Sequence, residues 1–130
     1  KEATKLLVPG TIWKEYHKEV GNIMTNQLLK LGLLDKADLQ NETAEKPAYK
    51  KYFMHGTSHH IGLDTHDYGL LHLPMESNMI FTVEPGIYIP KEGFGVRLED
   101  DVVIQKTGAP VNLMESIPIE IEEIETLMNA

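Results

Sequence analysis

Four histidines lie within twelve consecutive positions near the middle of the chain. The stretch reads His55-Gly56-Thr57-Ser58-His59-His60-Ile61-Gly62-Leu63-Asp64-Thr65-His66-Asp67. Imidazole is a common metal ligand and can exchange a proton near neutral pH. A single histidine is more often an ordinary hydrogen-bonded core or turn residue, and we interpret His17 and His72, which stand alone, in that way. Four histidines together, separated by glycines, favour a chemical role.

Two glutamates occupy the middle of segments that otherwise have the composition of strands: Glu84 after Phe81-Thr82-Val83, and Glu99 after Val96-Arg97-Leu98. Burying a carboxylate without a partner is costly, and a metal ion removes that cost because it binds ionised oxygen ligands. Arg97 shares a strand face with Glu99 and could hold a carboxylate through two hydrogen bonds. Alternatively, both glutamates face solvent and Glu84-Pro85-Gly86 is only a turn.

The elements that would position these glutamates are two neighbouring strands. Residues 79–89 and 95–105 are rich in Ile, Val, Phe, Thr and Tyr, and the segment between them contains Gly93. This pattern predicts an antiparallel hairpin with its turn at residues 90–94. If the register permits, the hairpin brings Glu84 and Glu99 together on one face, with Arg97 beside them.

Two amphipathic helices are predicted outside the hairpin. Apolar residues recur at four-residue intervals from Ile12 to Leu31, with Thr11 as the N-cap and Gly32 just past the last turn. Pro118 opens a second helical segment, because proline and glutamates suit a first helical turn. Residues 35–47 are polar and are predicted to form a loop or a short helix.

Three blocks of the chain together resemble the signature blocks of the aminopeptidase P family, in order and in spacing. They are Phe53-Met54-His55-Gly56-x-Ser58-His59-x-x-Gly62-Leu63-Asp64-x-His66-Asp67, Thr82-Val83-Glu84-Pro85-Gly86-Ile87-Tyr88 and Gly95-Val96-Arg97-Leu98-Glu99-Asp100-Asp101. The similarity continues through residues 117–125 and extends back to the first helix. Prolidases share these blocks but usually carry a longer excursion between the second and third, so the short 90–94 segment favours aminopeptidase P.

The resemblance implies an α+β chain that forms half of a pita-bread fold, a curved antiparallel sheet with flanking helices. Residues 1–130 would be the C-terminal part of the catalytic domain, a fragment of a longer protein. An isolated half would expose a sheet edge and an apolar helix-packing surface. We therefore expect a homo-oligomer.

The resemblance also implies a metal site. By family analogy His59, Glu84 and Glu99 are metal ligands, and Glu99 bridges two divalent ions, usually manganese. The family supplies two further ligands, a pair of aspartates on a preceding hairpin, and a further active-site histidine before them. The chain contains none of these, because Asp35 and Asp38 lie three positions apart in a polar segment. We expect the fragment to hold no pair of ions and to be inactive alone.

The same analogy assigns catalytic roles to four residues. Glu84 would carry a proton to the leaving proline nitrogen, and His66 would steady the tetrahedral intermediate. His55 would help to hold the substrate. Arg97 would contact the metal ligands and orient them without binding the metal itself.

The expected function is therefore a metal-dependent aminopeptidase that removes the first residue from peptides with proline at the second position. One alternative is a prolidase-like Xaa-Pro dipeptidase, which differs in substrate length. Another is a non-catalytic pita-bread protein that binds a partner, although such a protein has no reason to keep His59, Glu84 and Glu99 together.

Composition excludes several other classes. The net charge is −8 without a basic cluster, which argues against nucleic acid or an anionic membrane as a partner. No apolar run approaches the roughly 20 residues of a membrane span. The absence of cysteine excludes disulfides and thiolate zinc sites and fits a reducing compartment, so we expect a cytoplasmic location.

Overall fold

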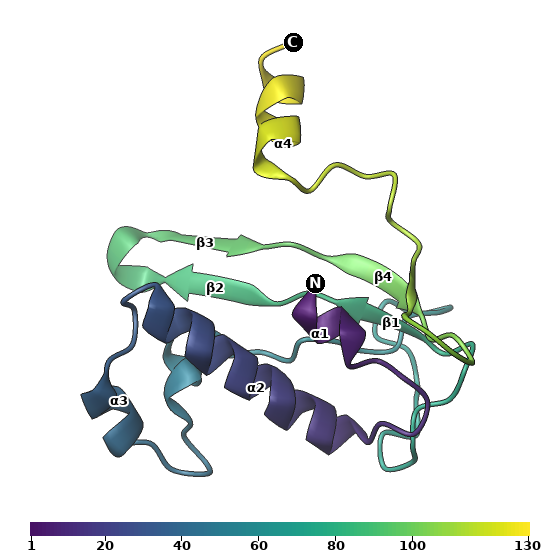
Figure 1. The fold of residues 1–130 in the computed structure, drawn as a ribbon, viewed down its shortest axis with the longest axis horizontal. Helices are drawn as coiled ribbons and strands as arrows, with labels where there is room; N and C mark the ends of the chain where they lie inside the picture. Colours follow the sequence, from purple (N-terminus) through teal and green to yellow (C-terminus); the bar gives the residue numbers. More distant parts are fainter.

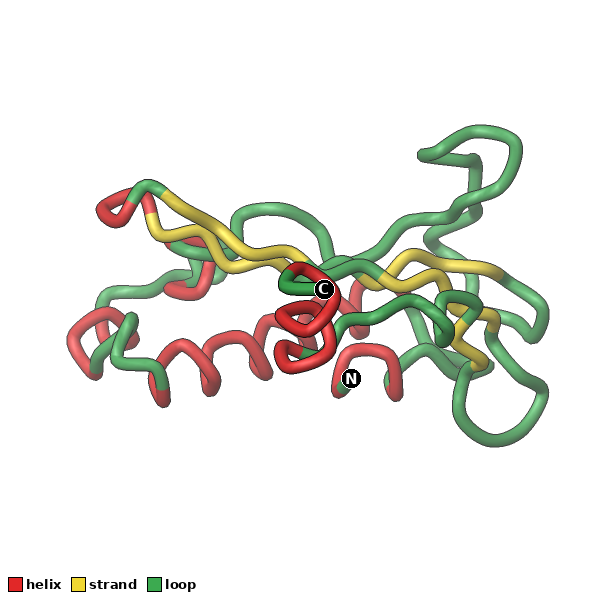
Figure 2. The backbone as a smooth tube through the Cα atoms, turned by 90° about the horizontal axis from the view of Figure 1, so that it is seen from above, coloured by secondary structure: helices red, strands yellow, loops and turns green.

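The computed structural model describes residues 1–130 and combines helices with antiparallel strands. The α-helices are α1 (Glu2–Lys5), α2 (Trp13–Lys30), α3 (Lys36–Gln40) and α4 (Ile121–Met128), and two 3-10 turns, η1 and η2, span Ala48–Lys51 and Pro90–Glu92. The strands are β1 (Ile80–Val83), β2 (Gly86–Ile89), β3 (Phe94–Arg97), β4 (Asp100–Val103) and β5 (Val111–Asn112). Figure 1 shows α1 and α2 on one side of the strands, and Figure 2 shows α2 running along them.

The long helix confirms the predicted amphipathic pattern, but its N-terminus differs from the prediction. Ile12 is the N-cap, and no side chain caps the helix. The Thr11 hydroxyl instead donates to the Leu6 carbonyl at 3.1 Å. Thr11 is held there because its own carbonyl accepts a hydrogen bond from the Met75 amide at 2.8 Å. Gly32, with φ +70°, lies just past the helix as predicted.

The polar segment after α2 contains the short helix α3. Asp35 accepts a hydrogen bond from the Asp38 amide, and Asp38 accepts one from the Asp35 amide. This reciprocal capping box occupies both carboxylates in starting the helix. Neither aspartate joins the histidine and glutamate cluster described below, as expected from the sequence.

The predicted hairpin is present, but it consists of four short strands instead of two long ones. β1 pairs with β4 and β2 pairs with β3, both antiparallel. The interruption falls at Glu84-Pro85 on one side and Leu98-Glu99 on the other, because Pro85 has no amide hydrogen to donate. Gly93, with φ +72°, provides the left-handed residue of the turn. β5, which the sequence did not predict, adds a third strand beside β4.

The hydrophobic core lies between the two N-terminal helices and the strands. Its central members come from α1, α2, the segment before β1 and the hairpin: Ala3, Leu7, Tyr16, Val20, Met24, Phe53, Met75, Phe81, Val83, Val102 and Ile104. Odd-numbered residues of β1 and even-numbered residues of β4 point into this core, as the two-residue period of a strand requires. The alternate residues, Thr82 and Asp101 among them, therefore point to the opposite face.

The C-terminal helix projects away from the rest of the chain (Figure 1). It begins at Ile121, three residues later than Pro118, which we predicted to open it. Glu120 forms an ion pair with Lys1, and Ile119 lines an apolar pocket, so this stretch follows the surface near α1 before the helix winds. No helix of the chain combines the length and the hydropathy of a membrane span.

Candidate metal centre

The histidine-rich segment lies beside β1 as an additional extended partner. The amide of Thr82 donates to the His59 carbonyl at 3.0 Å, and the amide of Glu84 donates to the Thr57 carbonyl at 2.7 Å. His60 forms an antiparallel bridge with Phe81. This register places His59 opposite Thr82, on the face that also carries Glu84.

A second contact fixes this segment from the other side of the sheet. Ser58, whose side chain alternates with that of His59, forms a 2.8 Å hydrogen bond with the hydroxyl of Tyr16 on α2. Burial raises the pKa of Tyr16 to about 12, so the phenol stays neutral and able to donate. The core helix thereby holds the segment that presents His59.

The hairpin register places the two glutamates opposite each other. Val83 pairs with Asp100, and Gly86 pairs with Arg97. Continuing either ladder through the interruption sets Glu84 against Glu99, on the face away from the core. This confirms the prediction that a hairpin aligns them, and it rules out opposite faces of the sheet.

The three predicted ligand side chains converge. One potential ligand atom from each of His59, Glu84 and Glu99 lies within 4.8 Å of the others. His59 Nε2 lies 3.1 Å from Glu84 Oε1, and these two side chains are 20% and 13% exposed. Glu99 is more open, at 43%.

Arg97 forms an ion pair with each of the two glutamates instead of two hydrogen bonds with one of them. Its Nη1 lies 3.5 Å from Glu84 Oε2 and its Nη2 lies 3.9 Å from Glu99 Oε2. The predicted bidentate contact with one carboxylate is therefore absent. The reason is the strand alternation, which puts Arg97 next to Glu99 and near the opposite Glu84, so that the guanidinium is shared between them.

His55 and His66 lie on the same side as the cluster. His55 Nδ1 is 2.7 Å from the Gly56 carbonyl and its Nε2 is 2.8 Å from the Tyr88 hydroxyl, so the ring is fixed at both nitrogens. The exposed ring of His66 meets the ring of His59 edge-on, with centroids 4.3 Å apart. Sequence reasoning missed Tyr88, although it lies four residues after Glu84 and so on the same strand face.

A polar pocket of about 410 Å³ unites these groups. It is lined by His55, Gly56, Ser58, His59, His66, Glu84 and Arg97, with no hydrophobic side chain. Five of the six residues predicted from the sequence to be functional line this pocket. The sixth, Glu99, has a carboxylate oxygen within 4.8 Å of a possible ligand atom of His59 and of Glu84. Such a pocket suits charged or strongly polar groups.

Comparison with known proteins supports one family. Metallopeptidase family M24 matches residues 1–106. The Xaa-Pro aminopeptidase of Escherichia coli is 43% identical over 138 residues, covering 97% of this chain, and that of Haemophilus influenzae is 40% identical over 141 residues, covering 99%.

The chain belongs to metallopeptidase family M24. Solved structures agree with this assignment: Escherichia coli aminopeptidase P with the inhibitor Pro-Leu superposes over 98% of the chain with a TM-score of 0.80 at 41% identity. Aminopeptidase PepP of Pseudomonas aeruginosa does so over 98% with a TM-score of 0.82 at 36% identity. These matches confirm the predicted half of a pita-bread fold. The chain spans about a third of these relatives, 31% or 32% of their length.

The donor set of this M24 chain fits a divalent cation. His59 Nδ1 lies 2.9 Å from the His60 carbonyl and therefore donates a hydrogen to it, while Nε2 faces Glu84 Oε1. Two acceptors at 3.1 Å repel unless a proton or a cation lies between them. One nitrogen among carboxylate oxygens suits a borderline or hard divalent metal.

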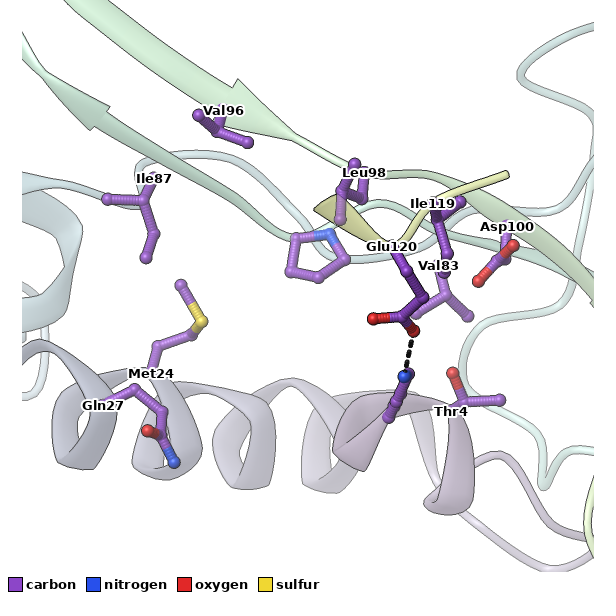
Figure 3. Close-up of a pocket in the computed structure, with 12 residues that line it drawn as sticks. Thr4, Met24, Gln27, Val83, Ile87, Val96, Leu98, Asp100, Ile119 and Glu120 are labelled. Carbon is purple, nitrogen blue, oxygen red and sulfur yellow. Dashed lines mark hydrogen bonds and ion pairs between the residues drawn. The ribbon is translucent and has the colours of Figure 1, made fainter. Parts of the chain in front are cut away.

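The M24 chain has a second pocket on the other face of the sheet (Figure 3). It measures about 380 Å³ and is largely apolar, with Met24, Val83 and Leu98 among its lining residues. Its ionisable groups are Lys1 and Glu120, which pair with each other, and Asp100. The one group of three possible metal ligands, His59, Glu84 and Glu99, lies outside this apolar pocket.

Proposed function

We propose that this chain forms part of the active site of an Xaa-Pro aminopeptidase that uses two divalent cations, with manganese as the metal. The enzyme would remove the first residue from peptides that carry proline at the second position. The observation that carries the proposal is the convergence of His59, Glu84 and Glu99 within 4.8 Å. It occurs in a chain whose relatives are named Xaa-Pro aminopeptidases.

His59 would hold a cation through Nε2, and the two glutamates would hold cations through carboxylate oxygens. Divalent cations in such a site acidify water and stabilise negative charge on a carbonyl oxygen. The Glu84 side chain is only 13% exposed to solvent. Its electrostatic interactions are therefore stronger than they would be in water, because the surrounding protein has a lower dielectric constant.

Glu84 would also transfer a proton, and the other pocket residues would bind the peptide. Glu84 lies in the pocket wall with one oxygen toward His59 and the other toward Arg97, so its carboxylate can accept a proton and return it to a leaving nitrogen. Arg97 offsets part of the negative charge of the two glutamates. His55, fixed by Tyr88, and His66 line the same pocket and would bind the substrate's polar groups.

The test is peptide hydrolysis by the natural full-length protein. The protein is stripped with a chelator, and turnover of a tripeptide with proline second is measured before and after Mn²⁺ is restored. Glu99→Ala removes one ligand and should lower kcat/KM by several orders of magnitude. Glu123→Ala, which removes an exposed carboxylate of α4, is the matched control and should leave turnover unchanged.

Each rival has its own outcome. Turnover of Xaa-Pro dipeptides alone would identify a prolidase-like enzyme, and activity that survives chelation would exclude a metallopeptidase.

Residues 1–130 expressed alone should give no turnover with Mn²⁺, because one cluster of three ligands is too few for two ions. Cytoplasmic location and self-association stay predictions, to be checked by fractionation and by light scattering.

A further inference from the structure

Thr82 lies between the two ligand-bearing segments and is completely buried, with 0% of its surface exposed. It belongs to β1, two residues before Glu84, and its side chain points to the same face. It stands opposite His59 in the register of the histidine-rich segment. No metal-ligand or catalytic role was predicted for it from the sequence.

Three hydrogen bonds connect Thr82 to the proposed ligands. Its amide donates to the His59 carbonyl at 3.0 Å, and its hydroxyl oxygen accepts from the His59 amide at 3.0 Å. The hydroxyl hydrogen is then free to donate to Glu84 Oε1, 3.4 Å away. The same Oε1 atom faces His59 Nε2 at 3.1 Å.

We propose that Thr82 is a positioning residue of the metal centre, whose hydroxyl holds the His59 main chain and the Glu84 carboxylate in the geometry that binds the cation. The inference rests on the proposed function. The hydroxyl accepts a hydrogen bond from the His59 amide and donates one to Glu84 Oε1. It therefore restrains both the main chain that carries the imidazole and the carboxylate. Without it, the His59 amide loses its acceptor and the carboxylate is free to turn toward Arg97.

Thr57 is a control that distinguishes a positioning role of the Thr82 hydroxyl from the effect of burial alone. It is also 0% exposed, and its carbonyl accepts a hydrogen bond from the Glu84 amide, but its hydroxyl has no hydrogen-bond partner. Both threonines are therefore fully buried and hydrogen-bonded through the main chain to a ligand-bearing residue, and only the Thr82 hydroxyl contacts His59 and Glu84. Replacing each by valine removes a buried hydroxyl in both cases.

The experiment measures Mn²⁺ affinity by titration calorimetry in the metal-stripped full-length protein and its variants. Thr82→Val should weaken Mn²⁺ binding about 10- to 100-fold, whereas Thr57→Val and Thr82→Ser should stay within about threefold, the serine because it retains the hydroxyl. The electron paramagnetic resonance spectrum of bound Mn²⁺ should change in Thr82→Val and return to the natural form in Thr82→Ser. If Thr82→Val does not fold, Thr82→Cys replaces it, because a thiol fills the space but is a weak hydrogen-bonding group.

Several results would overturn the inference. Natural affinity in Thr82→Val would show that the hydroxyl does not position the ligands, while leaving the proposed function intact. Equal losses in Thr57→Val and Thr82→Val would assign the effect to packing. Failure of serine to rescue binding would do the same. A natural protein that binds no divalent cation would overturn the proposed function, and this inference with it.

Discussion

His59 Nε2 and Glu84 Oε1 lie 3.1 Å apart, while His59 Nδ1 faces the His60 carbonyl at 2.9 Å. The pair comes from segments 25 positions apart, joined by the ladder between residues 57–60 and β1. The two side chains would hold a divalent cation together, and the cation would offset the negative charge of the carboxylate.

Glu84→Gln tests the contact directly. The amide of glutamine can donate to Nε2, which satisfies His59 without a cation but removes both the negative charge and the proton acceptor. We predict that kcat for a Xaa-Pro tripeptide falls about 10²- to 10⁴-fold. The glutamine keeps the size of the side chain but loses the ion pair with Arg97. Glu115→Gln, at an exposed carboxylate, is the control, and an unchanged kcat in Glu84→Gln would contradict the proposed role.

Arg97→Lys tests whether one guanidinium serves both glutamates. Two nitrogens of Arg97 reach Glu84 and Glu99, and the single ammonium of lysine cannot span both in the same way. We predict a loss of about 10- to 100-fold in kcat/KM, as for other residues that orient metal ligands. The control is Lys91→Met in the η2 turn of the same hairpin, which removes an exposed positive charge that takes part in no ion pair. A loss in the control as large as in Arg97→Lys would instead indicate a general effect of charge on the hairpin.

The alignment of Glu84 with Glu99 was predictable because it depends on local features. Gly93 supplies the turn, the flanking residues favour strands, and the two-residue period then fixes which side chains share a face. The interruption of the strands at Pro85 was not predicted, although its physical reason is local, since proline cannot donate to a ladder. The helix from Trp13 to Lys30 follows in the same way from its apolar periodicity.

The pairing of the histidine-rich segment with β1 was not predictable from pattern. Residues 57–60 lack a strand signature, and their partner lies more than twenty residues away, so only the folded chain shows that His59 lies opposite Thr82. Thr82 looked like an ordinary strand residue for the same reason. Thr11 misled the prediction of the N-cap, because its tertiary contact with Met75 outweighs the local preference for capping.

Gly21→Ala tests the packing of α2 against η1. In most exposed helix interiors this change stabilises by about 1 kcal/mol, because alanine has the higher helix propensity. Here a Cβ would lie 2.6 Å from Cε1 of Tyr49, too close for contact. Overpacking of this kind costs about 1–3 kcal/mol, so we predict a net loss in the free energy of unfolding, measured by chemical denaturation. In a Tyr49→Ala background the same substitution should become stabilising, and destabilisation in both backgrounds would contradict the packing argument.

His17 predicts how stability depends on pH. Its ring packs edge-on against Trp13 with centroids 4.7 Å apart, and burial lowers the pKa of His17 below its ordinary value near 6.5. In the unfolded chain the imidazole takes up a proton near pH 6.5, whereas the folded chain resists it until a lower pH. The unfolded state therefore binds more protons in that window. The stabilising contribution of neutral His17 is complete above pH 6.5 and is lost as the pH falls from there through the lowered pKa.

The measurement is the free energy of unfolding of the metal-free protein between pH 8 and pH 5, for the natural sequence and for His17→Gln. The variant should lose less stability across this range, because its side chain does not titrate. Burial also lowers the pKa of His60, so part of the slope should survive in His17→Gln and shrink further when His60→Gln is added. His72→Gln, at an exposed histidine, is the control and should keep the natural slope. Identical slopes in the natural protein and in His17→Gln would mean that the His17 ring reaches water in the folded state, and the packing of Trp13 over it would then have to be reconsidered.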